Sequence, residues 1–226
     1  MTRTPATDGR RTAAAARRRE RQQEIITATR ALFDERGVRD MKIEDVATSV
    51  GINRAIIYRH FSGKEELFAL TLVGYLKDLD ACLTGAVKGK RKPTTQLRAV
   101  IEAFVDFGLE YPAFVDCSLT LMRRPGPELL EEVSESAMFR LGREIATCME
   151  HVVIPIREGV ETGEMKVDDP YQLANTLYAT GLGGLQLARL GILVRPAAPG
   201  IPEVVPLPAA QVKDYLVRAA LALASA

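Results

Sequence analysis

The segment that most restricts the fold is residues 42–61, where two short helical patterns lie on either side of a glycine. The first pattern, over residues 42–50, repeats apolar side chains at the three- and four-residue spacing of one helix face. Gly51 follows at the position where a left-handed residue commonly ends a helix. Asn53 suits the N-cap of a second helix that reaches about His60. Two short helices joined by a turn of about three residues predict a helix-turn-helix.

The second helix, with the sequence NRAIIYRHF over residues 53–61, has two unlike faces. At about 100° per residue, Ile57 and Phe61 fall together and predict its buried side. The other side carries Arg54, Ala55, Tyr58 and Arg59. Arginine can bind guanine through two hydrogen bonds, tyrosine can donate to phosphate or pack on a thymine methyl, and alanine permits close approach. This face therefore suits a DNA major groove, although a helix face that is only solvated is the alternative.

The charge of the chain is distributed unevenly. Residues 1–64 hold 14 Lys and Arg against 8 Asp and Glu, a net of +6, whereas residues 65–226 hold 16 against 21, a net of −5. A basic segment joined to an acidic body suggests that one part meets polyanions and the other does not. An uneven distribution without such a partner is the alternative.

Helical spacing recurs along most of the chain, and we find no sustained strand pattern and no repeat of fixed period. Besides the two short helices, the expected helices cover about residues 18–37, 93–110, 112–123, 128–163 and 169–193, and a last helix closes the chain after residue 208. A capping box from Ser62 to Glu65 should open a further helix that reaches about Val87. Pro155 should kink or interrupt the helix over 128–163, and five prolines predict a loop over 195–208. The fold class that follows is all-α, with about nine helices.

Composition excludes several classes of protein. No apolar run reaches about eighteen residues and no signal peptide is recognisable, which predicts a cytoplasmic protein with no membrane contact. Cys82, Cys117 and Cys148 lie far apart and only two histidines accompany them, so we expect no metal site, no disulfide and no cofactor. An all-α enzyme is an alternative, but no Ser-His-Asp or Cys-His set and no phosphate-binding glycine loop supports it.

Residues 25–68 resemble the DNA-binding domain of the TetR family of bacterial transcriptional regulators. The positions that match the family pattern in order are Ala31, Phe33, Gly37, Ile43, Val46, Ala47, Gly51, Tyr58, His60, Phe61, Lys64, Glu65 and Leu67. The resemblance implies that Arg54, Ala55 and Tyr58 reach base edges. It also implies that Lys42, Asn53, Arg59, His60 and Lys64 lie near phosphates, with packing between helices as the alternative for His60. Ile56 departs from the family, since many members have Thr or Ser there.

The resemblance implies three parts of the chain. Residues 1–20 are expected to be a disordered basic arm because they carry almost nothing to bury. This arm contacts the DNA backbone or minor groove, or else is only a solubilising tail. Residues 21–66 form the DNA-binding domain, and residues 67–226 form a domain that binds an effector and makes a homodimer. The alternative is a helical ligand carrier or interaction module with a vestigial helix-turn-helix.

The expected effector is a largely apolar small molecule, since Met and Phe are frequent and polar groups are few in the expected pocket helices. The candidate ligand-binding residues are Tyr75, Phe104, Phe107, Phe114, Cys117, Leu121, Met122, Phe139, Arg143, Met149, His151 and Tyr178. Among them Arg143, His151 and Tyr75 would supply polar contacts. By linkage, an effector that prefers misplaced reading helices would weaken binding of double-stranded operator DNA. The resemblance implies that such a protein is a repressor.

The expected dimer interface lies on the last two helices. Gly181, Gly183 and Gly184 permit helices to approach closely, and residues 212–223 carry an apolar stripe. Packing within one chain is the alternative use of these residues. A dimer would place two reading helices about 34–36 Å apart, in successive major grooves of a palindromic site.

Overall fold

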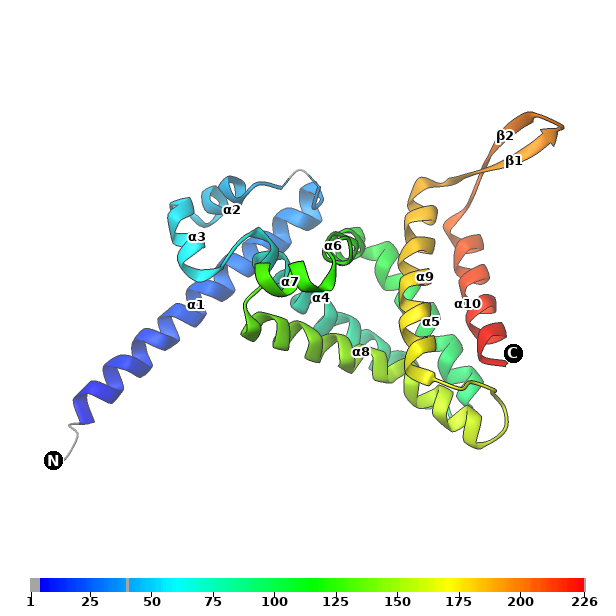
Figure 1. Cartoon of the computed structure of the whole chain (residues 1–226), viewed down its shortest axis with the longest axis horizontal. Coiled ribbons are helices and arrows are strands. Elements are labelled where there is room, and N and C mark those ends of the chain that lie inside the picture. The colour runs from blue at the N-terminus through cyan, green and yellow to red at the C-terminus, as the bar shows by residue number, and fades with distance from the viewer. Residues whose placement is uncertain (1–4, 40, 226) are drawn as a thin grey trace. The chain divides into compact units, whose positions relative to one another are not determined.

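A computed structural model of the chain describes residues 5–39 and 41–225 (Figure 1). Its helices are α1 (Pro5–Arg36), α2 (Ile43–Val50), α3 (Arg54–His60), α4 (Lys64–Val87), α5 (Pro93–Glu110), α6 (Pro112–Met122), α7 (Gly126–Glu132), α8 (Glu135–Glu161), α9 (Pro170–Leu190) and α10 (Ala209–Ser225). Two strands, β1 (Ile192–Ala198) and β2 (Ile201–Pro206), form one hairpin. The helical fold class is confirmed. Within the described ranges, no helix is both long and apolar enough to cross a bilayer.

The helices form two compact units. The first unit comprises the chain up to Val73 together with Asp116–Leu141, and the second comprises Gly74–Val115 and Gly142–Ala226. Helices α4, α6 and α8 each contribute residues to both units. The domain boundary expected between residues 66 and 67 stays a prediction.

In the first unit, α1 packs against α2 and α3 to form a three-helix domain. Its core contains Phe33 and Ile57, both about 1% exposed, and the Phe33 ring meets Phe68 edge-on at 4.8 Å. Gly51 ends α2 with a φ of 71°, a left-handed conformation that glycine adopts at little cost. The Asn53 side chain accepts a hydrogen bond from the Ala55 amide at 2.9 Å and caps α3. The predicted helix-turn-helix is therefore confirmed.

Helix α1 begins earlier than the sequence pattern indicated. It includes residues 5–20, for which we expected a disordered arm, so that expectation is corrected there; residues 1–4 lie outside the described residues. Residues 12–20 are exposed, so packing does not hold them in a helix. Alanine, arginine and glutamate have high helix propensity, and extending an existing helix avoids the cost of nucleation.

The expected helix over residues 128–163 is two helices, α7 and α8, which is a second correction. Val133 adopts an extended conformation and its side chain is buried. The Ser134 hydroxyl then accepts a hydrogen bond from the Ala137 amide at 3.4 Å, as at a helix N-terminus. Helix α8 continues through Pro155, so the proline does not interrupt it.

The segment expected to be a proline loop is a β-hairpin instead. Strands β1 and β2 are antiparallel, with Val194 opposite Val204 and Pro196 opposite Pro202. Gly200 lies between the strands with a φ of 77°. Each strand of a two-stranded sheet has an unpaired edge, where a missing proline N–H costs no ladder hydrogen bond. Five prolines therefore did not exclude pairing.

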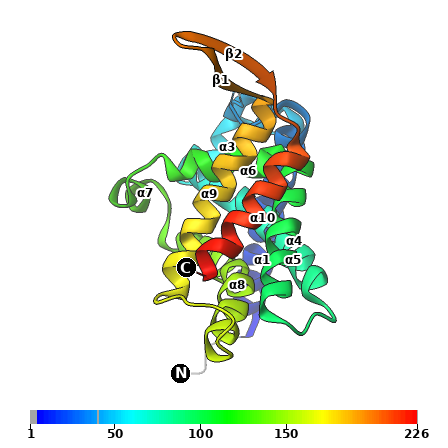
Figure 2. The same cartoon turned by 90° about the vertical axis from the view of Figure 1, so that its right-hand side faces the viewer.

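In the second unit, α5, α9 and α10 contact one another, and α9 and α10 run side by side (Figure 2). A Cβ at Gly181 would lie 2.7 Å from the Phe104 ring, and a Cβ at Gly184 would lie 2.7 Å from Leu216. These two glycines serve packing within the chain. Gly183 faces open space in the single chain, since a Cβ added there would meet no described atom within 4 Å.

Candidate DNA interface and ligand cavity

Helix α3 has the two faces that its sequence predicts. Ile57 and Phe61 are 1% and 2% exposed, whereas Tyr58 is 49% exposed. The side chains of Arg54, Ala55 and Arg59 are also exposed. We call Arg54, Ala55, Tyr58 and Arg59 the reading face. The buried isoleucine and phenylalanine anchor α3, so the reading face is presented on a fixed helix.

Arg54 contacts two neighbouring side chains on α2 and α3. Its guanidinium donates to Glu44 on α2 at 2.6 Å and lies 5.8 Å from the centre of the Tyr58 ring. The hydrogen bond from Arg54 lowers the pKa of the Glu44 carboxyl below its ordinary value. Both side chains of this ion pair are exposed, so the pair is weak and a guanine edge can compete with Glu44 for the guanidinium.

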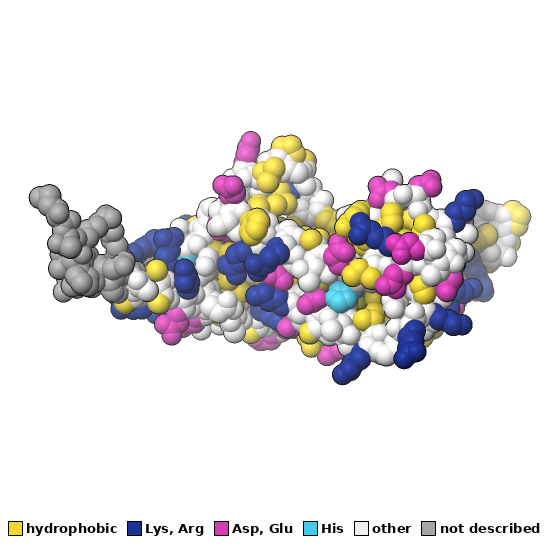
Figure 3. All heavy atoms as spheres, turned by 90° about the horizontal axis from the view of Figure 1, so that it is seen from below, with side chains coloured by type: hydrophobic (Ala, Val, Ile, Leu, Met, Phe, Trp, Pro, Cys, Tyr) yellow, Lys and Arg dark blue, Asp and Glu magenta, His cyan; other side chains and the backbone are white. Residues whose placement is uncertain are grey.

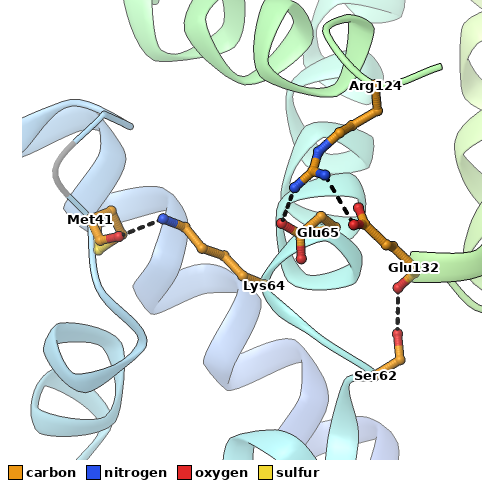
Figure 4. A network of polar contacts seen from close by, with 6 residues as sticks. All are labelled: Met41, Ser62, Lys64, Glu65, Arg124 and Glu132. Atoms are coloured by element: carbon orange, nitrogen blue, oxygen red, sulfur yellow. Dashed lines mark hydrogen bonds and ion pairs between the residues drawn. The ribbon is translucent and has the colours of Figure 1, made fainter. Parts of the chain in front are cut away.

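The residues predicted to lie near phosphates fall into two groups. Lys42 and Asn53 stand at the starts of α2 and α3, and both are exposed. The backbone N–H of Lys42 donates to the Asp45 carboxylate at 3.0 Å, and this leaves its ammonium outside the helix cap. Lys64 differs, because its ammonium donates to the Met41 carbonyl at 2.9 Å (Figure 4) and lies 5.0 Å from the centre of the Phe68 ring. The Lys64 ammonium thus makes its contacts within the domain.

His60 is half-buried at the end of α3. Its Nδ1 atom is buried and, among the described residues, has no hydrogen-bond partner. Burial lowers the pKa of the imidazole below its ordinary value of 6.5, and the positive charges of Arg18, Arg59 and Arg21 lower it further. His60 is therefore a neutral side chain surrounded by cations near neutral pH.

A polar network joins the start of α4 to the segment around α7 within the first unit (Figure 4). Arg124 donates to Glu65 at 3.2 Å and pairs with Glu132 at 3.1 Å. The predicted capping box between Ser62 and Glu65 is therefore wrong: the Ser62 backbone N–H donates to Glu66 at 2.7 Å, because Glu65 faces Arg124 instead.

Glu66 is the buried member of this region, at 6% exposure. Its carboxylate accepts hydrogen bonds from Ser62 and, at 2.7 Å, from the Ser134 hydroxyl. Burial alone would raise the pKa of Glu66, but the hydrogen bonds from Ser62 and Ser134 outweigh it, so the pKa lies below its ordinary value. Glu66 is therefore ionised, and its two serine hydrogen-bond donors are Ser62 and Ser134.

The second unit contains an apolar cavity of about 40 Å³ between α4, α5, α8 and α9. The residues that line it are Leu76, Leu79, Leu83, Val100, Ile101, Phe104, Ile145, Cys148, Met149, Val152, Ala174, Leu177 and Tyr178. Phe104, Met149 and Tyr178 were predicted to bind ligand, and they line this cavity. The lining is aliphatic and aromatic with few polar atoms, so it can hold an apolar group without unpaired polar contacts.

The other predicted ligand residues occupy different places. Tyr75, Phe107 and Phe114 belong to an aromatic cluster in the second unit, and all three are buried. In the first unit, Cys117 and Leu121 are buried, and the Cys117 thiol donates to the Phe68 carbonyl at 3.4 Å. Met122 and Phe139, also in the first unit, are 52% and 71% exposed.

The predicted polar contacts have partners outside the cavity lining. Arg143 donates to Glu144 at 2.7 Å. The Nε2 atom of His151 lies 2.7 Å from the Asp80 carboxylate, in a partly buried pair. Residue type therefore indicated polar groups near a pocket, but it could not indicate which helix face each one occupies.

Sequence reasoning missed most of the aliphatic lining. The available signal was the helical spacing of Leu76, Leu79 and Leu83 on α4 and of Ile145, Cys148 and Val152 on α8, which is the same spacing that core residues show.

Cys148 is neutral here, because burial first and the charges of Asp80 and Glu144 second raise the pKa of its thiol to about 12. Within the described residues, no cluster of His, Cys, Asp and Glu could hold a metal ion.

The geometry of α2 and α3, with an exposed polar face on an anchored helix, defines a helix-turn-helix. Residues 25–71 match the family model described as bacterial regulatory proteins, tetR family. The match covers the helix-turn-helix and the start of α4, so the similarity to that family is shown for this segment of the chain.

Two curated relatives are similar over the N-terminal part. The transcriptional activator FasR of Mycolicibacterium smegmatis is 29% identical over 84 residues, 37% of this chain and 38% of FasR. The transcriptional repressor KstR2 of Mycobacterium tuberculosis is 32% identical over 80 residues, 35% of this chain and 40% of KstR2. Both relatives are regulators of transcription, and the matched region spans about two fifths of their length.

Solved structures resemble the chain over most of its length. RolR bound to resorcinol superposes with a TM-score of 0.66 at 16% identity, covering 93% of this chain and 90% of RolR. KstR2 of Mycobacterium tuberculosis superposes with a TM-score of 0.58 at 22% identity, covering 91% of this chain and 95% of KstR2. FadR from Bacillus subtilis, solved with stearoyl-CoA, superposes with a TM-score of 0.61 at 13% identity, covering 89% of this chain and 98% of FadR. At these identities the similarity shows a shared fold.

Proposed function

We propose that this protein is a ligand-responsive transcriptional repressor that binds a palindromic operator as a homodimer and is released by a small, largely apolar molecule. The observation that carries the proposal is the reading face of α3, in which Arg54 and Tyr58 are exposed on a helix anchored by Ile57 and Phe61. This arrangement matches the needs of major-groove recognition, with two guanidinium groups, a phenol and a small residue on one side.

Uncovered apolar surface on α9 and α10 supports the homodimer. Leu187 and Leu190 on α9 are 43% and 63% exposed, and Tyr215 and Leu223 on α10 are 47% exposed or more. A second copy would cover these side chains in a four-helix contact, and Gly183 would allow close approach there. Gly181 and Gly184, which we also expected at the interface, contribute only indirectly because they pack within the chain.

The apolar cavity supports an effector of low polarity. Its volume of about 40 Å³ is well below the roughly 300–1,000 Å³ of ordinary ligand pockets. A ring-sized effector therefore has to separate helices that line the cavity, and binding is coupled to a change of conformation. RolR, solved with resorcinol, and FadR, solved with stearoyl-CoA, suggest two chemical classes to try.

The coupling we propose is reciprocal. An effector that binds better when the reading helices are misplaced weakens operator binding by the same factor by which operator DNA weakens effector binding. Effector affinity that is equal with and without operator DNA would contradict this switch.

The test starts from DNA fragments that the protein retains from a random pool. A phenol and a long-chain acyl-CoA are then added separately, and release is followed by fluorescence anisotropy. We expect one class to release the DNA. A ligand carrier with a vestigial helix-turn-helix would bind one of these molecules yet show no preference for any retained fragment and no steep loss of DNA affinity with salt.

A further inference from the structure

We propose that the N-terminal part of α1 is a second DNA-binding element, in which Arg18 and Arg21 bind backbone phosphates beside the reading helix. The proposal rests on the proposed function, because it assumes that α3 meets DNA. It adds a contact of different chemistry, which is independent of base sequence and lies outside the helix-turn-helix.

The first observation is the helix itself. Residues 12–21 are exposed and continue α1 beyond the part that packs in the domain core. A helix keeps its side chains in fixed directions, about 100° apart per residue. The arginines of this segment therefore have defined sides, which a flexible tail would not give them.

The second observation is the direction of the arginines. At about 100° per residue, the buried residues of α1 span an arc of about 120°; they are Ile25, Ile26, Thr29, Leu32 and Phe33. Arg18 falls inside this arc and Arg21 lies about 20° beyond one edge, whereas Arg17 lies about 60° beyond the same edge. Arg18 and Arg21 thus extend the packed side of α1.

The third observation is contact with the reading helix. The Arg18 guanidinium donates to the backbone carbonyl of Arg59 at 3.5 Å. Arg18, Arg21 and Arg59 lie close enough to His60 for each to disfavour a positive charge on its imidazole. Three guanidinium groups from two helices therefore gather at the end of α3. Figure 3 shows Lys and Arg side chains in dark blue on one face of the molecule.

The charges favour a polyanion as the partner. The guanidinium groups of Arg18, Arg21 and Arg59 repel one another, and phosphate groups placed between them would reduce this repulsion. Guanidinium groups also bind phosphate oxygens through paired hydrogen bonds. Glu20 and Glu24 also lie on this part of α1, and Arg21 pairs with Glu24 at 2.7 Å. Both side chains of this pair are about half exposed, so the pair can open. A solubilising tail would not require arginines directed to the reading helix.

The experiment compares the full chain with a double variant, Arg18→Ala and Arg21→Ala, and with the matched control Arg17→Ala. Affinity for a selected operator fragment and for random DNA of equal length is measured by fluorescence anisotropy at several salt concentrations. Alanine preserves the helix, which circular dichroism checks. Each lost phosphate contact reduces the log–log salt slope by about 0.9, so we expect the double variant to lose about 2 from the slope.

We expect the double variant to lose affinity for both DNAs by a similar factor, and Arg17→Ala to change neither slope nor affinity. Replacing Arg18 and Arg21 with lysine should retain most of the slope. An unchanged slope in the double variant would overturn the proposal, and so would a loss confined to the operator fragment. If the unaltered chain shows no sequence preference, the proposed function itself fails, which is a separate result.

Discussion

The reading helix and the cavity helices use their side chains in opposite ways. On α3 the residues proposed to act are polar and exposed, and the apolar residues only anchor the helix. In the second unit the residues proposed to act are apolar, and they line a cavity formed by four helices. Recognition by α3 depends on spacing within one short helix. Recognition by the cavity depends on the packing of segments far apart in the chain.

This difference means that the two sites should respond differently to mutation. A change on the reading face should alter DNA binding and leave the fold intact. A change beside the cavity should alter packing and ligand binding together, because the lining is also core.

The largest effect is expected from the anchor of α3. Ile57→Ala removes a side chain that is 1% exposed and should lower the free energy of unfolding by about 2–5 kcal/mol. Ile56→Ala, on a half-buried neighbour, is the matched control and should cost less than about 1 kcal/mol. Urea denaturation measures both. Equal losses would mean that α3 is not divided into an anchoring and a presented side.

The next effect concerns close packing in the second unit. Gly181→Ala places a methyl 2.7 Å from the Phe104 ring, which lines the cavity, and overpacking of this kind costs about 1–3 kcal/mol. The matched control Gly142→Ala lies at an exposed position of α8 where an added Cβ meets no described atom within 4 Å, and it should stabilise that helix by about 0.5–1 kcal/mol. Thermal unfolding at one protein concentration measures both. Equal changes in the two variants would contradict this packing.

A smaller effect is expected from the network at the start of α4. Arg124→Ala breaks ion pairs with Glu65 and Glu132 whose side chains are about 30–40% exposed, so it should cost at most about 1 kcal/mol. Ser134→Ala removes a donor to the buried Glu66 carboxylate and should cost more, about 1–3 kcal/mol. Denaturation at neutral pH compares the two. A larger loss of stability in Arg124→Ala than in Ser134→Ala would mean that the ion pairs of Arg124 stabilise this network more than the hydrogen bonds to Glu66 do.

The smallest effect is a pH dependence from His60. Its pKa in the folded chain lies below 6.5, so below pH 6.5 the unfolded chain binds more protons at this residue than the folded chain does. The stability of the protein relative to His60→Gln should therefore fall as pH drops from about 6.5 towards the folded pKa, and level off below it. Unfolding of the two proteins between pH 5 and 8 measures the difference. Curves that stay parallel would contradict a neutral, buried His60.

The sequence was informative where local chemistry decides the structure. The effects of Gly51 and Asn53 reach no further than about two residues along the chain. Their positions in the sequence therefore predicted the end of α2 and the cap of α3 correctly. Ile57 and Phe61 are separated by one helical turn, so their shared burial followed from helix geometry. The resemblance to the TetR family covered the same region as the family match over residues 25–71.

The sequence was less informative where distant segments meet. Tyr75 and Phe114 are buried in an aromatic cluster, and nothing in their spacing separates that role from contact with a ligand. The hairpin was missed because prolines usually signal loops, whereas here the strands pair on one edge only. The break at Val133 was missed because its apolar side chain continues the helical stripe, and only the fold shows its extended conformation.

The most direct test of the central claim is selection of DNA from a random pool by the unaltered chain and by Arg54→Ala. We expect the unaltered chain to enrich a palindrome with half-sites one helical turn, about 10 base pairs, or a multiple apart. We also expect Arg54→Ala to cost about 1–3 kcal/mol and to relax the choice of base at one position of each half-site. No enrichment by the unaltered chain, or identical base choice at every position by Arg54→Ala, would contradict a reading face on α3.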